Sequence, residues 1–168
     1  HTIYYPASRW EEYSRVWNCT HLICGELLLL RHNAVLLHSS VVMLEGKAVL
    51  FSGPSGAGKS TQARLWEKYR GARIVNGDRT AVTVGQEGVF AHGIPYCGTS
   101  GICGRAVLPV EAIVYLSQGP ESVARPLNGL RAFRRVWEGV SVNTWDKEDL
   151  ERVSAVVKVL LETVPVRY

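Results

Sequence analysis

The amino-acid sequence predicts an α/β domain in which helices flank a mixed, hairpin-rich sheet. Two strand-like runs, residues 41–44 and 47–51, are separated by only Glu45 and Gly46, which favours a tight hairpin. The second run leads directly into a glycine-rich loop and then a helical segment. Because parallel neighbours need a crossover of about a dozen residues or more, these two strands are expected to be antiparallel. The sheet around the loop is therefore expected to be mixed rather than all parallel.

Further strands are predicted downstream. The runs that are rich in apolar and β-branched residues are 73–75, 81–84, 89–92 and 111–116. Asn76-Gly77 and the segment 85–88 read as the turns between the first three runs, which predicts an antiparallel meander. Residues 93–109 carry four glycines and two prolines without a clear periodicity, so we expect a long loop there.

Helices are predicted where apolar side chains recur at helical spacing. One covers residues 60–70 and is ended by Gly71. A second covers residues 128–139, and a third begins after an Asp146 N-cap and stops before Pro165. One or two further helices, packed on the sheet, are expected in the first thirty residues.

Length and composition indicate one domain over residues 1–168. The charged fraction of 20% and the apolar fraction of 46% are ordinary for a globular protein. The net charge of +4 comes from basic residues spread along the chain, and Arg131, Arg134 and Arg135 read as the solvated face of a helix. A phosphate-bearing ligand explains this excess, so nucleic acid is not the expected partner. The apolar runs are too short to span a bilayer, so no membrane partner is expected either.

A G-x-x-x-x-G-K-[ST] string follows the strand at 47–51 and opens the helix at 60–70, a context typical of a phosphate-binding P-loop. Its small residues let backbone N–H groups point at phosphate oxygens, and the helix N-terminus adds positive charge. Lys59 is expected to reach the β- and γ-phosphates of ATP, and the Ser60 hydroxyl to bind Mg²⁺. The expected nucleotide-binding residues are Gly53, Pro54, Ser55, Gly56, Ala57, Gly58, Lys59, Ser60 and Thr61.

The cysteines, Cys19, Cys24, Cys97 and Cys103, lack the spacing common in zinc knuckles. A chain built around a nucleotide-binding loop is expected in the cytoplasm, where thiols stay reduced. We therefore expect four free and mostly buried thiols.

Phosphoryl transfer also needs an acidic residue for the metal, usually near the end of a buried strand. Asp78 is the candidate because it closely follows the apolar pair Ile74-Val75, whereas the strand at 113–116 ends in Ser117-Gln118. Asp78 is also readable as a turn residue after Asn76-Gly77, but the P-loop upstream favours the metal ligand.

His38 lies just before the hairpin among apolar neighbours. A lone histidine in such surroundings is more often structural than catalytic, so the pattern alone does not assign it a role.

Three stretches together resemble the catalytic domain of HPr serine kinase/phosphorylase and its relatives, which are phosphoenolpyruvate-carboxykinase-like P-loop kinases. They are LHSS at 37–40, GPSGAGKST at 53–61 and IVNGDR at 74–79. The resemblance implies a P-loop in a mixed, β-rich sheet and an ATP- and Mg²⁺-dependent kinase that phosphorylates a serine hydroxyl of a protein or peptide. It also implies a homo-oligomer, an active-site role for His38 near the phosphates, and a place for Asp78 in the family's acidic pair.

The sequence departs from this family where Gly77-Asp78 replaces a pair of aspartates. Either Asp78 serves both roles or His38 takes one of them, and a loss of catalytic power is also compatible with Gly77. The segment 94–101 stands where the family has a glycine-rich loop near the acceptor, and Arg105 is the candidate for a charge-stabilising arginine. The expected catalytic residues are His38, Lys59, Asp78 and Arg105, with Ser60 and Asp78 as metal ligands.

Two other functions stay open at the level of sequence. Guanylate-kinase-type nucleotide kinases share the GPSGAGKST loop, but they begin with it, whereas a long segment with a hairpin strand precedes it here. A small-molecule kinase of this kind is therefore the second choice among enzymes. A non-catalytic nucleotide-binding regulator is favoured by Gly77. The acceptor, whether a carrier protein, a peptide precursor or free serine, is not identified by the sequence.

Overall fold

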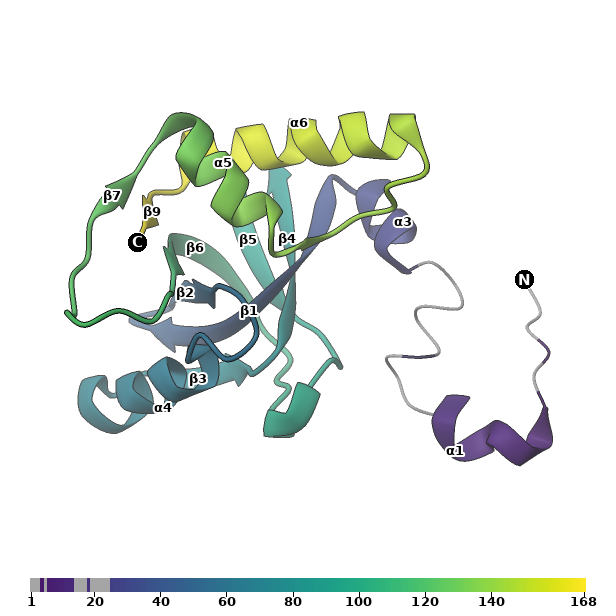
Figure 1. The fold of residues 1–168 in the computed structure, drawn as a ribbon, viewed down its shortest axis with the longest axis horizontal. Coiled ribbons are helices and arrows are strands. Elements are labelled where there is room, and N and C mark those ends of the chain that lie inside the picture. The colour runs from purple at the N-terminus through teal and green to yellow at the C-terminus, as the bar shows by residue number, and fades with distance from the viewer. Residues whose placement is uncertain (1–3, 5, 14–17, 19–24) are drawn as a thin grey trace.

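The computed structural model describes residue 4, residues 6–13, residue 18 and residues 25–168 (Figure 1). The strands are β1 (Ala34–Leu44), β2 (Lys47–Ser52), β3 (Arg73–Asn76), β4 (Arg79–Gly85), β5 (Gly88–Gly93), β6 (Val107–Tyr115), β7 (Pro126–Leu127), β8 (Val140–Ser141) and β9 (Val166–Arg167). The helices are α1 (Trp10–Tyr13), α3 (Gly25–Leu30), α4 (Lys59–Arg70), α5 (Gly129–Trp137) and α6 (Lys147–Thr163), with short 3₁₀ helices η1 (Ala7–Arg9) and η2 (Gly98–Ser100).

The sheet is mixed, as predicted. β1 and β2 form an antiparallel hairpin, and its turn residues Glu45 and Gly46 both have positive φ values, 52° and 78°. Two-residue turns of this kind match the twist of the strands that they join. On its other edge β2 pairs in parallel with β6. The strand that enters the glycine-rich loop therefore has one antiparallel and one parallel neighbour.

Strand pairing closes a circuit around the long strands β1 and β6. β1 pairs with β4 through its first half and with β2 and β3 through its second half. β5 then joins β4 to the first half of β6, whose second half returns to β2. This circuit places the end of β2 beside the middle of β1, where the predicted site residues lie.

The predicted meander is wrong in one part. β3 pairs with β1 rather than with β4, and the two strands follow one another along β1 in a register from Met43↔Arg73 to Ala34↔Thr83. Asn76-Gly77 is therefore an irregularity within this path and not a turn that reverses the chain. The Asn76 side chain accepts hydrogen bonds from the backbone N–H groups of Asp78 and Arg79, which stabilises the irregular backbone there. The predicted hairpin between β4 and β5 is confirmed.

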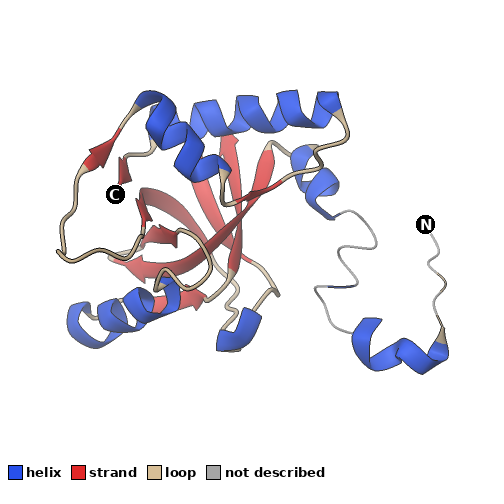
Figure 2. Cartoon of the chain, viewed as in Figure 1, coloured by secondary structure: helices blue, strands red, loops and turns tan. Residues whose placement is uncertain are grey.

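Helices cover both faces of the sheet (Figures 1 and 2). α4 packs over a small core that includes Val42, Phe51 and Ala63, and α5 and α6 pack over a larger core on the opposite face. The three predicted helices are confirmed, and Asp146 caps α6 by accepting hydrogen bonds from the N–H groups of Glu148 and Asp149.

The helices predicted for the first thirty residues lie partly outside the described residues. α3 packs against β1 and α6. Within the described part of the chain, no helix has the length and apolar character that crossing a membrane requires.

Candidate functional site

The glycine-rich loop joins the end of β2 to the start of α4. Gly53 has a φ of 140°, and a Cβ atom there would lie 2.5 Å from the carbonyl oxygen of Leu116, just after β6. Gly56 and Gly58 also have positive φ values, 78° and 99°, but nothing lies within 4 Å of where a Cβ atom would be. The loop is therefore held tightly at its base and leaves its backbone bare at its tip, which suits close approach of a ligand.

Lys59 is a buried cation at the end of this loop, with only 8% of its surface exposed. Its ammonium group donates hydrogen bonds to the carbonyl oxygens of Gly53 and Pro54, each at 2.9 Å. Burial lowers the pKa of Lys59, and the negative charge of Asp78 partly opposes this. Among the described residues, no carboxylate lies within 4.0 Å of its ammonium group. A buried charge without an ionic partner is costly, so this position fits an anionic ligand.

His38 and Asp78 form an ion pair beside the loop. His38 Nε2 lies 3.4 Å from Asp78 Oδ1, and the two side chains are 31% and 32% exposed. The hydrogen bond from His38 holds the pKa of the Asp78 carboxyl below its ordinary value, with smaller effects of the charges of His38, Arg79 and Lys59, while burial acts in the opposite sense. Asp78 is thus an ionised carboxylate that is still accessible from solvent.

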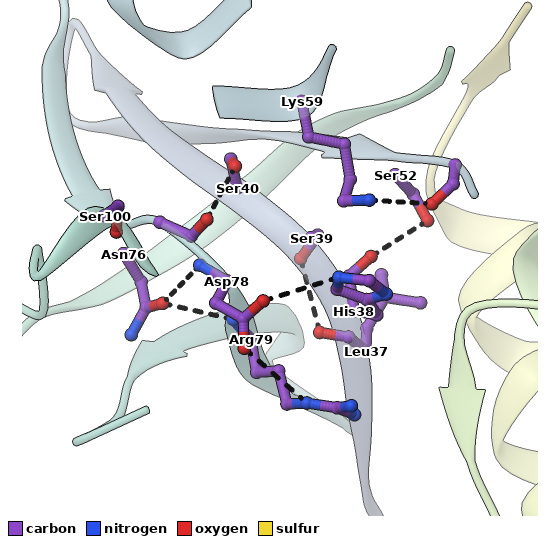
Figure 3. A network of polar contacts seen from close by, with 12 residues as sticks. Leu37, His38, Ser39, Ser40, Ser52, Lys59, Asn76, Asp78, Arg79 and Ser100 are labelled. Atoms are coloured by element: carbon purple, nitrogen blue, oxygen red, sulfur yellow. Dashed lines mark hydrogen bonds and ion pairs between the residues drawn. The ribbon is translucent and has the colours of Figure 1, made fainter. Parts of the chain in front are cut away.

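Backbone pairing brings these two residues together. The N–H of Ser39 donates to the carbonyl oxygen of Asp78 at 2.9 Å, and the Ser40 hydroxyl donates to the carbonyl oxygen of Gly77 at 3.0 Å. β1 thereby holds the irregular segment between β3 and β4 in place. In Figure 3, Lys59 extends toward the side of β1 that carries His38, and the Asp78 carboxylate faces the His38 ring. Asp78 pairs with His38, and its charge also acts on Lys59, so the three predicted residues lie near one another.

The prediction of four free, buried thiols is wrong for Cys97 and Cys103. These residues form a disulfide, and Cys97 is half-buried while Cys103 is exposed. The segment between them turns back through Gly98 and Gly101, both at positive φ, which brings the two Cα atoms to 4.9 Å. The cysteine spacing was compared only with that of zinc sites, and this comparison does not detect a local turn that brings two cysteines together. Cys19 and Cys24 lie outside the described residues.

The disulfide-closed loop, residues 97–103, packs directly against Asp78. A Cβ atom at Gly98 would lie 2.6 Å from the Asp78 Cβ atom. A Cβ atom at Gly77 would overlap the Ser100 hydroxyl and lie 2.6 Å from its Cβ atom. Ser100 therefore fills the space that a side chain at position 77 would need. The packing of this loop therefore leaves no room for an aspartate at position 77, where the sequence departs from an Asp-Asp pair.

Arg105 and Arg79 have different relations to the pair. Arg105 is exposed in the segment that leads into β6, and within the described part of the chain its side chain makes no ion pair or hydrogen bond. Arg79 was not among the predicted site residues. Its Nε lies 3.7 Å from Asp78 Oδ2, and its Nη1 donates to the Ser141 hydroxyl at 2.7 Å. The sequence signal that could have identified Arg79 as a site residue is its position directly after Asp78.

The donor set for a metal is small. In the described residues, no group of three or more His, Cys, Asp or Glu side chains is placed to hold a metal ion. Ser60, exposed at the second position of α4, and Asp78 are oxygen donors of the kind that Mg²⁺ prefers. Sites in phosphoryl-transfer proteins usually combine one or two such groups with phosphate oxygens and water, so the residues present fit Mg²⁺ bound with a nucleotide.

Comparison with protein-family models gives no match to this chain, and comparison with curated proteins gives none either. One similar solved structure is the HPr(Ser) kinase/phosphatase from Coxiella burnetii, with a TM-score of 0.41 and 13% sequence identity. The likeness covers 55% of this chain and 76% of that chain. It is a partial likeness in fold, and it does not show to which family the chain belongs.

Proposed function

We propose that the chain is an ATP-dependent phosphotransferase that transfers the γ-phosphoryl group to a serine hydroxyl of a protein or peptide. The observation that carries this proposal is the buried Lys59, which has no ionic partner among the described residues and ends a bare glycine loop beside the His38–Asp78 pair. A phosphate-binding cation next to an ionised carboxylate is the combination that phosphoryl transfer to a hydroxyl needs.

Each residue has a role that its surroundings support. The backbone N–H groups of the loop and the start of α4 would hold the β- and γ-phosphates, because the first N–H groups of a helix have no partner within it. Lys59 would turn from its loop carbonyls to the phosphates, and Ser60 and Asp78 would bind Mg²⁺. Mg-ATP, when bound, supplies the phosphoryl group and the neutralising charge of the metal.

Asp78 is also the proposed acceptor of the proton from the serine hydroxyl, with His38 as the group that orients it. The lowered pKa of Asp78 keeps the carboxylate free to accept a hydrogen bond from that hydroxyl. Arg79 and Arg105 are the candidate charge-stabilising arginines. Of the two, Arg79 is held near the carboxylate, so we assign this role first to Arg79.

We propose a polypeptide acceptor because the described residues provide a wall beside the site rather than a lid over it. Nucleotide kinases close a sizeable inserted segment over two small substrates to exclude water. The long irregular segment here, between β5 and β6, contains only the short η2 helix and is fixed to β3 through Gly104 and the disulfide-closed loop. A polypeptide acceptor can itself exclude water from the site.

A non-catalytic nucleotide-binding regulator is the second candidate, and the packing of Ser100 against Gly77 favours it. This packing leaves Asp78 as the one carboxylate at the pair of positions where the resembled family has two.

Incubation with labelled ATP tests the proposal, with nucleoside monophosphates, free serine and serine-containing peptides offered separately. We expect label on a peptide serine, and no label in a parallel reaction with the Lys59→Ala variant. Rapid conversion of a monophosphate to a diphosphate with no labelled peptide would indicate the nucleotide kinase. Nucleotide binding without turnover of any acceptor would indicate the regulator.

A further inference from the structure

A second basic site lies at α5, and its lining includes none of the residues of the site around Lys59 and Asp78. A cavity of about 520 Å³ lies between α5 and the paired strands β7 and β9. Its lining consists of Arg125, Pro126, Leu127, Arg131, Arg134, Arg135, Glu138 and Tyr168. Figure 1 shows α5, β7 and β9 together around the C-terminal end. The volume falls in the range of cavities that bind small molecules.

Three of the four arginines of this cavity come from α5, and Arg125 comes from the segment just before β7. Arg131, Arg134, Arg135 and Glu138 recur at three- and four-residue intervals, whereas Ala132 and Val136 point into the core. The sequence pattern predicts that Arg131, Arg134 and Arg135 form a solvated helix face. They are exposed, as expected, but they gather around a hollow instead of pointing separately into water.

Most of this positive charge is not neutralised by the protein. Arg135 pairs with Glu138 at 3.2 Å and stacks over the Tyr115 ring at 4.9 Å from its centroid. In the part of the chain that the structure describes, Arg125, Arg131 and Arg134 have no carboxylate within ion-pair distance. Three guanidinium groups thus line one cavity without an ion pair to any described residue within 4.0 Å, although the charge of Arg134 acts on Glu138 from a longer distance. Guanidinium groups hydrogen-bond phosphate oxygens in pairs, and several of them together match a ligand with several negative charges.

The cavity walls are held in place by pairing that does not use these three side chains. The backbone groups of Arg125 and Tyr168 exchange hydrogen bonds of 2.7 and 2.8 Å, which extends the β7–β9 ladder. The Ser117 hydroxyl donates to the Tyr168 hydroxyl, and the next residue, Gln118, donates to the carbonyl oxygen of Gly56 in the glycine-rich loop. The cavity is therefore preformed and is connected to the loop through two consecutive residues.

We propose that this arginine cavity binds a small molecule that carries two or more phosphate groups, at a site separate from the glycine-rich loop. Arg125, Arg131 and Arg134 contact the phosphates, and Arg135 forms a fixed wall behind them. The proposal does not depend on the kinase function, because none of these residues takes part in the site around Lys59 and Asp78.

Calorimetric titration with inorganic pyrophosphate, without added metal and at low ionic strength, tests the proposal. The Lys59→Ala variant serves as the starting protein, so that the loop no longer contributes its own phosphate-binding cation. We expect saturable binding of one pyrophosphate. The Arg131→Gln/Arg134→Gln pair in this background should weaken it about 10-fold or more, since it removes two charge-assisted contacts to the phosphates.

The matched control is Arg31→Gln/Arg70→Gln, which removes the same charge from two exposed positions on other elements. This control should change the affinity by less than about 2-fold, because distant surface charges act only through a screened field. Equal weakening by both pairs would show non-specific attraction, and absence of saturable binding would remove the site. Either result overturns the proposal.

Titration with citrate, a carboxylate ligand of comparable charge, tests whether the site prefers phosphate. If citrate binds more tightly than pyrophosphate, the assignment to phosphate is overturned. If the double variant unfolds, the exposed Arg125→Gln variant replaces it, with an expected weakening of about 5-fold because only one contact is removed. Failure of Mg-ATP to bind the wild-type protein would contradict the kinase proposal alone, since the arginine cavity is measured with Lys59 removed.

Discussion

The Asp78 carboxylate lies 3.4 Å from the imidazole Nε2 of His38 because β1 pairs with an irregular segment between two strands. The hydrogen bond between Ser39 N–H and the carbonyl oxygen of Asp78 fixes the backbone of one residue to the strand that carries the other. The pair is therefore a product of sheet register and not of sequence proximity.

The Asp78→Asn variant should lose far more activity than nucleotide affinity. A metal ligand or proton acceptor acts mainly on the transition state, so we expect phosphotransfer to fall by about 10²-fold or more. The dissociation constant for Mg-ATP should change much less. Parallel measurement of turnover and of Mg-ATP binding checks this, and near-normal turnover would show that Asp78 is only a structural residue.

The stability contributed by Asp78 should depend on pH in a defined direction. Its folded-state pKa lies below the ordinary value of 3.8, so the ionised carboxylate stabilises the folded protein at neutral pH. This contribution is complete above the ordinary pKa and is lost as the pH falls through the lower folded-state value. The difference in free energy of unfolding between wild type and Asp78→Asn should therefore shrink below about pH 4.

Urea unfolding from pH 7 downwards measures that difference. His38→Gln is the control background, because the hydrogen bond from His38 is the largest cause of the lowered pKa. In that background the dependence on pH should be weaker. A difference that stays constant across the whole range would contradict the assignment.

The Gly77→Ala variant should destabilise the fold by about 1–3 kcal/mol, because a new methyl group would overlap Ser100. Gly85→Ala is the matched control, since nothing lies within 4 Å of a Cβ atom there and the glycine has no positive φ. Adding Ser100→Gly to Gly77→Ala should recover part of the loss. Chemical denaturation of the wild type, the two single alanine variants and the double variant measures these differences in stability. Equal stability of the two single alanine variants would be evidence against the described packing.

The Cys97→Ser/Cys103→Ser variant should lower the free energy of unfolding by about 2 kcal/mol, the scale expected for a short closed loop. It should also speed amide exchange at Gly77, whose N–H donates to the Ile102 carbonyl oxygen inside that loop. Exchange measured by NMR checks this, and wild-type protein in a reducing buffer should behave like the variant. Identical exchange at Gly77 with and without reductant would mean that the disulfide does not hold the loop on Asp78.

The parts of the fold that depend on local signals could be predicted from the sequence. The β1–β2 hairpin follows from a two-residue turn, α6 follows from an N-cap and an apolar stripe, and α4 follows from the glycine-rich loop that precedes it. Each of these elements is specified within a window of about a dozen residues, where turn, cap and periodicity signals act.

The parts that depend on distant contacts could not. β3 carries no local signal that assigns it to β1 rather than to β4, so the irregular Asn76-Gly77 segment was predicted as a turn. The fit of Ser100 against Gly77 and of Gly98 against Asp78 depends on how a loop returns to the sheet. For the same reason His38 could be assigned to the site only through a family resemblance and not from its apolar neighbours.

Calorimetric titration of Mg-ATP into the wild-type protein and the Lys59→Ala variant measures whether the glycine-rich loop binds a nucleotide through Lys59. We expect wild-type protein to bind Mg-ATP and the variant, still folded by its melting curve, to bind at least about 10-fold more weakly, because it lacks the cation that neutralises the phosphates. Lys68→Ala, an exposed lysine further along α4, should leave the affinity unchanged. An unchanged dissociation constant in Lys59→Ala would contradict the assignment of the glycine-rich loop as a nucleotide-binding site.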